Sequence, residues 1–350
     1  MNEHRRIIIA FAALGKFLRE FSMESPKNDM SQKLQEVVRK AGHHNGWFTS
    51  ENVLYALKHW GELLTEDALT DWLKSYLKSH DFNRNRPKII GIIMAGNIPL
   101  VGFHDFLSVL LTGNKALAKL SSNDNVLLYF IKDYLVQIEP LLEDRIRFVD
   151  GKMKDFEAVI ATGSDNTARY FEYYFGKVPN LIRKNRNSIA VLTGQESDEQ
   201  LNALGEDVFR FYGLGCRSVS KLFVPKEYDF DRFFESIYAY HPIIEQTKYA
   251  NNYDYNKAVY LMSEFRILDN GFLILKEDES YASPIASLFY ERYTSLETLK
   301  KRLKKDDHLL QCVVSEGILE KEIPFGQTQI PALTDYADGV DTVDFLLNLP

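Results

Sequence analysis

Short apolar segments alternate with helix-length segments between residues 88 and 192 of this chain. The apolar segments have the length of buried strands, and they lie at 88–95, 116–120, 145–149, 158–162 and 188–192. Strands and helices that alternate at this spacing favour right-handed βαβ units and a parallel sheet. The sequence therefore predicts an α/β protein. Because 350 residues exceed what one hydrophobic core usually serves, we expect about two domains.

The residues before this region, 1–80, are predicted to be helical. A helical apolar stripe follows Ser50, and Thr65 precedes a second stripe. The apolar run 7–14 is short and is followed closely by charged side chains, so we interpret it as an amphipathic helix or strand rather than a signal peptide.

Composition excludes several classes of protein. A net charge of −7 argues against a general nucleic-acid binder, and no run approaches the length of a membrane span. Two cysteines far apart in the sequence do not form a disulfide framework, which favours a reducing, cytoplasmic location. The eight histidines lack metal-ligand spacing and no CxxC occurs, so we predict no metal site.

Cys216 lies between a glycine-bearing turn and a predicted strand at 218–225. A thiol held in this way can be a nucleophile, although a lone cysteine is more often buried and inert. Arg217 favours reactivity, because a nearby cation lowers the pKa of a thiol. No histidine is adjacent in sequence, so a proton donor would have to come from afar, with His104 and His241 as candidates.

Polar residues lie near or just after the ends of the predicted strands. Asn97 can offer its side-chain amide to an oxyanion or cap its own turn. Lys119 can reach a nucleotide ribose or phosphate, with the hydroxyls of Ser121 and Ser122 beside it, or be an ordinary strand-end lysine. The turn at Gly163 and Ser164 opens a helix, whose N-terminus suits an anion but is equally typical of a plain capped helix.

In this order the motifs resemble the aldehyde dehydrogenase superfamily. More closely they resemble the acyl-CoA reductase family, which contains the reductase component of the bacterial bioluminescence fatty-acid reductase complex. The resemblance runs from about residue 87 to the C-terminus. It rests on the segments 95–99, 113–122, 162–164, 183–188, 213–218 and 324–327.

The resemblance implies an aldehyde dehydrogenase-like fold and a role for each motif. Cys216 would be the nucleophile that carries the acyl group as a thioester. Asn97 and the backbone N–H of Cys216 would form the oxyanion hole. Lys119, Ser121 and Ser122 would hold the adenosine ribose, and Gly163 and Ser164 would lie beside the nicotinamide. An acidic residue often stands at the position of Ser122 in NAD-preferring relatives, so its replacement by serine favours NADPH over NADH.

One segment departs from the pattern of the hydrolytic aldehyde dehydrogenases. Those enzymes carry a glutamate base just before the strand matching 188–192, and Arg183 stands near that position here. Without the glutamate, the thioester would last long enough to be reduced or returned to CoA. Arg183, Lys184 and Arg186 would contact CoA phosphates or form a solvated basic loop.

These expectations combine into one hypothesis about function. The chain would reduce a long-chain fatty acyl-CoA to fatty aldehyde and CoA, with NADPH as reductant. It would be a homo-oligomer with an acyl-activating synthetase as partner. The alternatives are an acyl-holding or acyl-transferring subunit without redox turnover, and a reductase for a short-chain acyl-CoA. The expected division is a helical region at 1–80, a nucleotide-binding domain at 81–186, a catalytic domain at 187–323, and a tail at 324–350. That tail would return to the active site or to a partner subunit.

Overall fold

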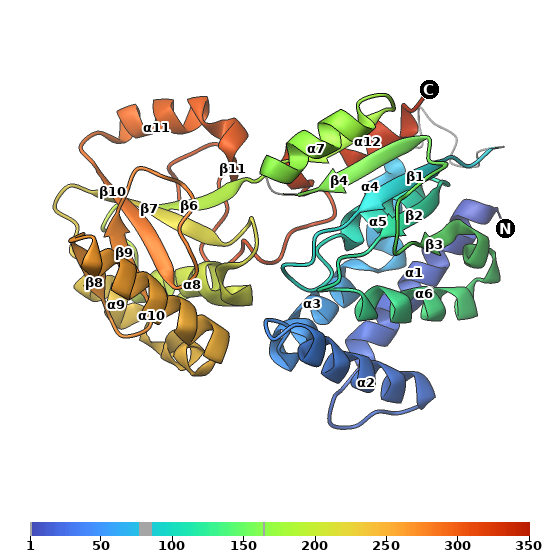
Figure 1. Cartoon of the computed structure of the whole chain (residues 1–350), viewed down its shortest axis with the longest axis horizontal. Helices are drawn as coiled ribbons and strands as arrows, with labels where there is room; N and C mark the ends of the chain where they lie inside the picture. Colours follow the sequence, from blue (N-terminus) through green and yellow to red (C-terminus); the bar gives the residue numbers. More distant parts are fainter. Residues whose placement is uncertain (1, 77–85, 164) are drawn as a thin grey trace. The chain divides into compact units, whose positions relative to one another are not determined.

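The computed structural model describes residues 2–76, 86–163 and 165–350. The chain divides into two compact units (Figure 1). Unit 1 comprises Met1–Lys184 and Ala332–Pro350, and unit 2 comprises Asn185–Pro331. Both units contain a largely parallel sheet with helices, which confirms the predicted α/β class.

Before the first sheet, the described residues form the helices α1 (Glu3–Glu20), α2 (Asp29–His44), α3 (Ser50–Leu63) and α4 (Glu66–Lys74). The apolar run 7–14 lies in α1, whose buried face includes Ile7, Phe11 and Leu14 at helical spacing. Helix α3 begins at Ser50, but its N-cap is Thr49, since the Thr49 side chain accepts a hydrogen bond from the backbone N–H of Asn52.

The sheet of unit 1 has five parallel strands: β1 (Ile89–Ile93), β2 (Lys115–Lys119), β3 (Ile146–Phe148), β4 (Ala158–Thr162) and β5 (Asn180–Arg183). The strand order is β3-β2-β1-β4-β5, so the order reverses between β1 and β4. The connections contain α5 (Phe103–Leu111), α6 (Val126–Ile138), η1 (Pro140–Arg145) and α7 (Asp165–Phe175). The sequence predicted every strand of this sheet except β5.

The sheet of unit 2 has the strand order β11-β6-β7-β10-β9-β8. Its strands are β6 (Asn187–Val191), β7 (Val219–Pro225), β8 (Ile267–Asp269), β9 (Ile274–Glu277), β10 (Ser287–Tyr293) and β11 (Leu310–Val314), and only β8 is antiparallel to its neighbour. The helices are α8 (Asp198–Phe209), η2 (Arg210–Gly213), α9 (Asp231–Ser236), η3 (Tyr238–Glu245), α10 (Thr247–Met262), α11 (Leu296–Lys305) and η4 (Asp307–Leu309). Consecutive residues of β7 pack into different apolar clusters on the two faces of the sheet. Leu222 belongs to one cluster and Phe223 to the other, because successive side chains of a strand point to opposite faces.

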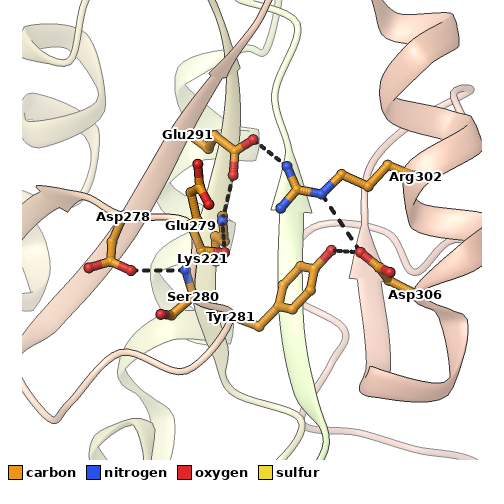
Figure 2. A network of polar contacts seen from close by, with 8 residues as sticks. All are labelled: Lys221, Asp278, Glu279, Ser280, Tyr281, Glu291, Arg302 and Asp306. Atoms are coloured by element: carbon orange, nitrogen blue, oxygen red, sulfur yellow. Dashed lines mark hydrogen bonds and ion pairs between the residues drawn. The ribbon is translucent and has the colours of Figure 1, made fainter.

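Figure 2 shows a polar network around Lys221. The Lys221 Nζ atom lies 4.8 Å from the centroid of the Phe223 ring. The Lys221 side chain is fully buried, and its Nζ donates to Glu291 Oε2 and to the Glu279 carbonyl, each at 2.8 Å. Burial lowers the pKa of Lys221, and the bond to Glu291 opposes that effect. Arg302 of α11 also pairs with Glu291, and the Ser220 hydroxyl donates to the Tyr281 carbonyl at 2.7 Å. These contacts tie β7 to the segment 278–281.

The C-terminal residues 332–350, with η5 (Ala337–Gly339) and α12 (Thr342–Leu347), belong to unit 1. Arg183, at the end of β5, is 3% exposed and forms an ion pair with Asp105 of α5 at 2.6 Å. The same guanidinium donates to the Ala337 carbonyl and to the Thr342 hydroxyl. This buried arginine therefore holds the C-terminal segment against α5 and β5.

Candidate active site

Asn97 and Gly163 follow β1 and β4, and Lys119 is the last residue of β2. Because these strands are parallel, the three residues lie at the carboxyl edge of one sheet. The loops after β1 and β4 flank the point where strand order reverses, which is where open α/β sheets bind ligands. Asn97, Lys119 and Ser122 are exposed and Gly163 is half-buried. Ser164 lies outside the described residues.

The loop that carries Asn97, residues 94–100, rests on the loop of Lys119 and Ser121. The backbone N–H of Met94 donates to the Lys119 carbonyl at 3.1 Å. A Cβ atom at Gly96 would lie only 2.5 Å from the Ser121 side chain, so only glycine permits this approach. At the far end, the backbone N–H of Leu100 donates to Asp124 Oδ2 at 2.8 Å.

Leu100 adopts a left-handed backbone conformation with a φ of 58°. That conformation costs a non-glycine residue roughly 1–2 kcal/mol, so surrounding contacts must hold it. Its hydrogen-bond partner Asp124 is 5% exposed, and within the described part of the chain Asp124 Oδ1 has no hydrogen-bond partner. Burial raises the pKa of Asp124 to about 7, while the bond from Leu100 opposes that rise.

Gly163 lies where β4 turns into α7. A Cβ atom at this position would come within 2.9 Å of the Phe171 ring and 3.0 Å of the Thr167 side chain. The absence of a side chain at 163 therefore keeps the turn between β4 and α7 close to the helix.

Cys216 is exposed, in the loop between η2 and β7 of unit 2. The other cysteine, Cys312, is buried in β11 at 3% exposure. Three consecutive residues before the loop, Phe211, Tyr212 and Gly213, have φ values of 54°, 59° and 73°. Left-handed non-glycine residues are costly and concentrate at functional sites. The accessible thiol thus follows a strained turn.

Hydrogen bonds hold the cysteine loop on both sides. The buried Ser188 of β6 donates its hydroxyl to the Cys216 carbonyl at 2.8 Å. The backbone N–H of Ser218 donates to the Gly215 carbonyl at 3.0 Å. Arg217 donates through Nε to the carbonyl of Thr328. The cation beside the cysteine is therefore anchored to the segment 324–329.

Asp207 of α8 in turn fixes the segment 324–329. Its fully buried carboxylate accepts from the backbone N–H of Gly326 at 2.6 Å, and from the backbone N–H and hydroxyl of Thr328 at 2.9 and 2.8 Å. Burial raises the pKa of Asp207, and these hydrogen bonds oppose the rise. Neither Asp207 nor Asp124 was predicted from sequence, because buried acids carry no local signal that separates them from surface acids.

The structure corrects the interpretation of Arg183. The residue was expected to contact CoA phosphates or to lie in a solvated loop, but its guanidinium is buried in the ion pair with Asp105. Lys184 forms an exposed ion pair with Glu172 at 2.9 Å, and Arg186 donates to the Leu310 carbonyl.

The two histidines predicted as candidate proton donors, His104 and His241, lie in different surroundings. His104 is packed among Trp72 and Tyr336, with Nε2 2.9 Å from the Leu333 carbonyl, and burial lowers its pKa. It helps to hold the C-terminal segment in unit 1, which argues against a role as proton donor. His241 is exposed in η3 and stacks on Tyr238.

Two further properties concern the described residues only. They contain no cluster of three or more histidine, cysteine or acidic side chains that would hold a metal ion. Among their helices, none combines the length and the apolarity that crossing a membrane requires.

Residues 23–239, more than half of the chain, match the sequence profile described as Acyl-CoA reductase (LuxC). The chain belongs to the acyl-CoA reductase (LuxC) family. This confirms the resemblance drawn from the ordered motifs. No curated protein matches the sequence.

Solved structures confirm the aldehyde dehydrogenase-like fold of this LuxC-family chain. Aldehyde dehydrogenase 21 from Physcomitrella patens, solved with succinate, has a TM-score of 0.61 at 12% identity, over 98% of this chain and 87% of that one. An aldehyde dehydrogenase from Bacillus cereus, solved with NAD+, has a TM-score of 0.60 at 13% identity, over 91% and 73%. An oxidoreductase from Marinobacter aquaeolei has a TM-score of 0.60 at 13% identity, over 85% and 70%.

Proposed function

We propose that this chain reduces an acyl-CoA to an aldehyde and free CoA through a thioester on Cys216. The observation that carries the proposal is the exposed Cys216 thiol on its strained, braced loop, in a chain of the acyl-CoA reductase family. Cys312 is buried and does not compete for this role.

The first half-reaction transfers the acyl group. The Cys216 thiolate attacks the thioester carbonyl, the side-chain amide of Asn97 and the backbone N–H of Cys216 donate to the oxyanion, and CoA leaves as its thiolate. In the second half-reaction the carbonyl carbon of the acyl-enzyme is reduced. The resulting thiohemiacetal on Cys216 then collapses to aldehyde and regenerates the thiolate.

A nicotinamide nucleotide supplies the hydride when it is bound. The residues at the carboxyl edge of the unit 1 sheet fit such a group, since Lys119 and Ser122 are exposed there and Gly163 presents backbone without a side chain. We propose that Lys119, Ser121 and Ser122 hold the adenosine ribose, and that Gly163 and Ser164 lie beside the nicotinamide. A neutral Ser122 next to a cationic Lys119 admits a 2′-phosphate, which favours NADPH over NADH.

The residue at position 183 supports reduction rather than hydrolysis of the thioester. This arginine stands near the place of the glutamate base of hydrolytic relatives, and it is fixed in an ion pair with Asp105. A permanently charged guanidinium cannot activate water as a general base. The acyl group that we favour is a long fatty chain, delivered by an acyl-activating synthetase to a homo-oligomer in the cytoplasm.

The test measures NADPH consumption with acyl-CoA thioesters of graded chain length. The parent and Cys312→Ala are expected to consume NADPH and form aldehyde, and Cys216→Ala is expected to lose this activity. Turnover that persists in Cys216→Ala would contradict the thioester mechanism. Mass spectrometry of the protein incubated with acyl-CoA alone should find the acyl group on Cys216. Acylation without NADPH consumption at any chain length would instead support an acyl-holding subunit.

A further inference from the structure

We infer that Asp124 is a positioning residue for acyl transfer, because its carboxylate fixes the loop that presents Asn97. This inference rests on the proposed function, in which Asn97 donates to the oxyanion. Asp124 lies in the turn after β2 and the Asn97 loop follows β1, so the carboxylate joins two adjacent strand ends.

The Asn97 loop is held at both of its ends, by different means. At its start the bond from Met94 to the Lys119 carbonyl continues the β1–β2 ladder, and Gly96 packs on Ser121. At its end the backbone N–H of Leu100 donates to Asp124 Oδ2. Leu100 is left-handed there, so the bond holds a conformation that leucine does not adopt by itself.

The carboxylate of Asp124 does not hold its own turn. That turn is closed by the bond from the Asp124 N–H to the Ser121 carbonyl, and by the bond from the Asn123 N–H to the Ser121 hydroxyl. A change confined to the Asp124 side chain therefore acts on the Asn97 loop and leaves the turn of Lys119, Ser121 and Ser122 in place. This separation predicts loss of acyl transfer with retained cofactor binding.

Because Asp124 is buried, its carboxylate is not easily replaced as the acceptor of the Leu100 N–H. Asp124 is 5% exposed, so a lost acceptor there is not replaced by bulk water, and the Leu100 N–H would be left unsatisfied. The substitution Asp124→Asn, by contrast, would keep a side-chain oxygen of the same reach. The two substitutions Asp124→Leu and Asp124→Asn therefore introduce side chains of similar shape, and only asparagine keeps an oxygen that can accept from the Leu100 N–H.

The experiment measures the first-order rate of Cys216 acylation, the Kd for NADPH and hydrogen exchange at the Leu100 amide. Asp124→Leu is expected to slow acylation about tenfold, which is part of the roughly 10²–10³-fold rate enhancement that one oxyanion donor supplies. The Kd for NADPH should stay within about twofold of the parent value. Asp124→Asn should restore the rate. In an Asn97→Ala background, Asp124→Leu should slow acylation by less than about twofold, since the group it positions is gone.

Unchanged acylation in Asp124→Leu, or an equal loss in the Asn97→Ala background, would overturn the inference while the proposed function stands. Absence of any acyl-enzyme in the parent would overturn the proposed function instead. Hydrogen exchange tests the bond between Leu100 and Asp124 in either case, because the measurement does not depend on enzymatic activity. The Leu100 amide of the parent should be protected and that of Asp124→Leu should exchange faster. Exchange of the parent amide at the rate of an unprotected peptide would contradict the bond itself.

Discussion

Asp207 and Thr328, 121 positions apart in the sequence, are joined by two hydrogen bonds inside unit 2. A third bond, from the Gly326 N–H, ends on the other oxygen of the same carboxylate. The carbonyl of Thr328 then accepts from Arg217, the neighbour of Cys216. A single buried carboxylate thus supports the cysteine loop through the segment 324–329.

Asp207→Ala is expected to destabilise unit 2 by roughly 3 kcal/mol, because it leaves three donors without their acceptor, two on the buried Thr328 and one on the half-buried Gly326. It should also make Cys216 less reactive, since the anchor of Arg217 is loosened. Urea unfolding and the rate of thiol alkylation measure the two effects. Asp198→Asn, an exposed residue of the same helix, is the control and should change neither by much. Equal effects of the two substitutions would contradict this role of Asp207.

Alkylation should distinguish the two thiols of the folded protein. Cys216 is exposed and Cys312 is buried in β11, so iodoacetamide is expected to modify Cys216 at least about tenfold faster. Peptide mapping after a short exposure measures the ratio, and exposure in urea should abolish it. Comparable modification of both cysteines under native conditions would show that the cysteine loop is not as the structure describes it.

Ser122→Asp is expected to change the cofactor preference. A carboxylate at this exposed position would repel a 2′-phosphate and accept hydrogen bonds from ribose hydroxyls, so KM for NADPH should rise by about tenfold or more relative to KM for NADH. Asn123→Asp adds the same charge one residue away and should have a much smaller effect on the ratio of the two KM values. If both variants shift this ratio equally, Ser122 does not face the ribose.

The buried Asp124 should make folding stability depend on pH. Its pKa is raised from 3.8 to about 7 in the folded state, so between these values the folded protein binds a proton that the unfolded chain has lost. The free energy of unfolding therefore falls as the pH rises through this window, and the decrease is complete above about pH 7. Relative to Asp124→Asn, the parent should lose roughly 2–3 kcal/mol between about pH 5 and pH 8. Parallel stability curves for the two proteins would contradict the raised pKa.

Glu291→Gln is expected to destabilise unit 2 by about 3 kcal/mol. The substitution leaves the fully buried Lys221 ammonium without its charged partner, and that penalty is larger than the value of the intact pair. Glu297→Gln removes an exposed ion pair with Lys300 on α11 and should cost less than about 1 kcal/mol. Thermal unfolding of both variants measures the difference, and equal losses would indicate that Lys221 is not held as Figure 2 shows.

The parallel strands of unit 1 could be predicted because strands buried on both faces form continuous apolar runs. Strand β5 escaped prediction, because it is only four residues long and ends in Arg183, whose charge is typical of a loop. The partners of that arginine lie 78 positions earlier, at Asp105, and 159 positions later, at Thr342. No local pattern encodes contacts at such separations.

The residues of the candidate site also fall into a group that the sequence predicted and a group that it did not. The residues at or after the ends of strands and turns were identified from motifs, namely Asn97, Lys119, Gly163 and Cys216, and the experiments above test their proposed roles. The residues that hold them, Asp124, Asp207 and Ser188, were not identified. Each is a buried polar side chain whose partner is a backbone group of another segment, so its importance is visible only after folding.

The docking of residues 332–347 on Arg183 and α5 also bears on the order in which the protein can be made. Unit 1 encloses unit 2 in the sequence, so a ribosome completes all of Asn185–Pro331 before it supplies the last helix of unit 1. Asp105 and Arg183 are therefore synthesised before unit 2, and they gain Thr342 only after all of Asn185–Pro331 has been made. A chain cut after Pro331 would therefore keep every residue of unit 2 and leave Arg183 without its partners Ala337 and Thr342.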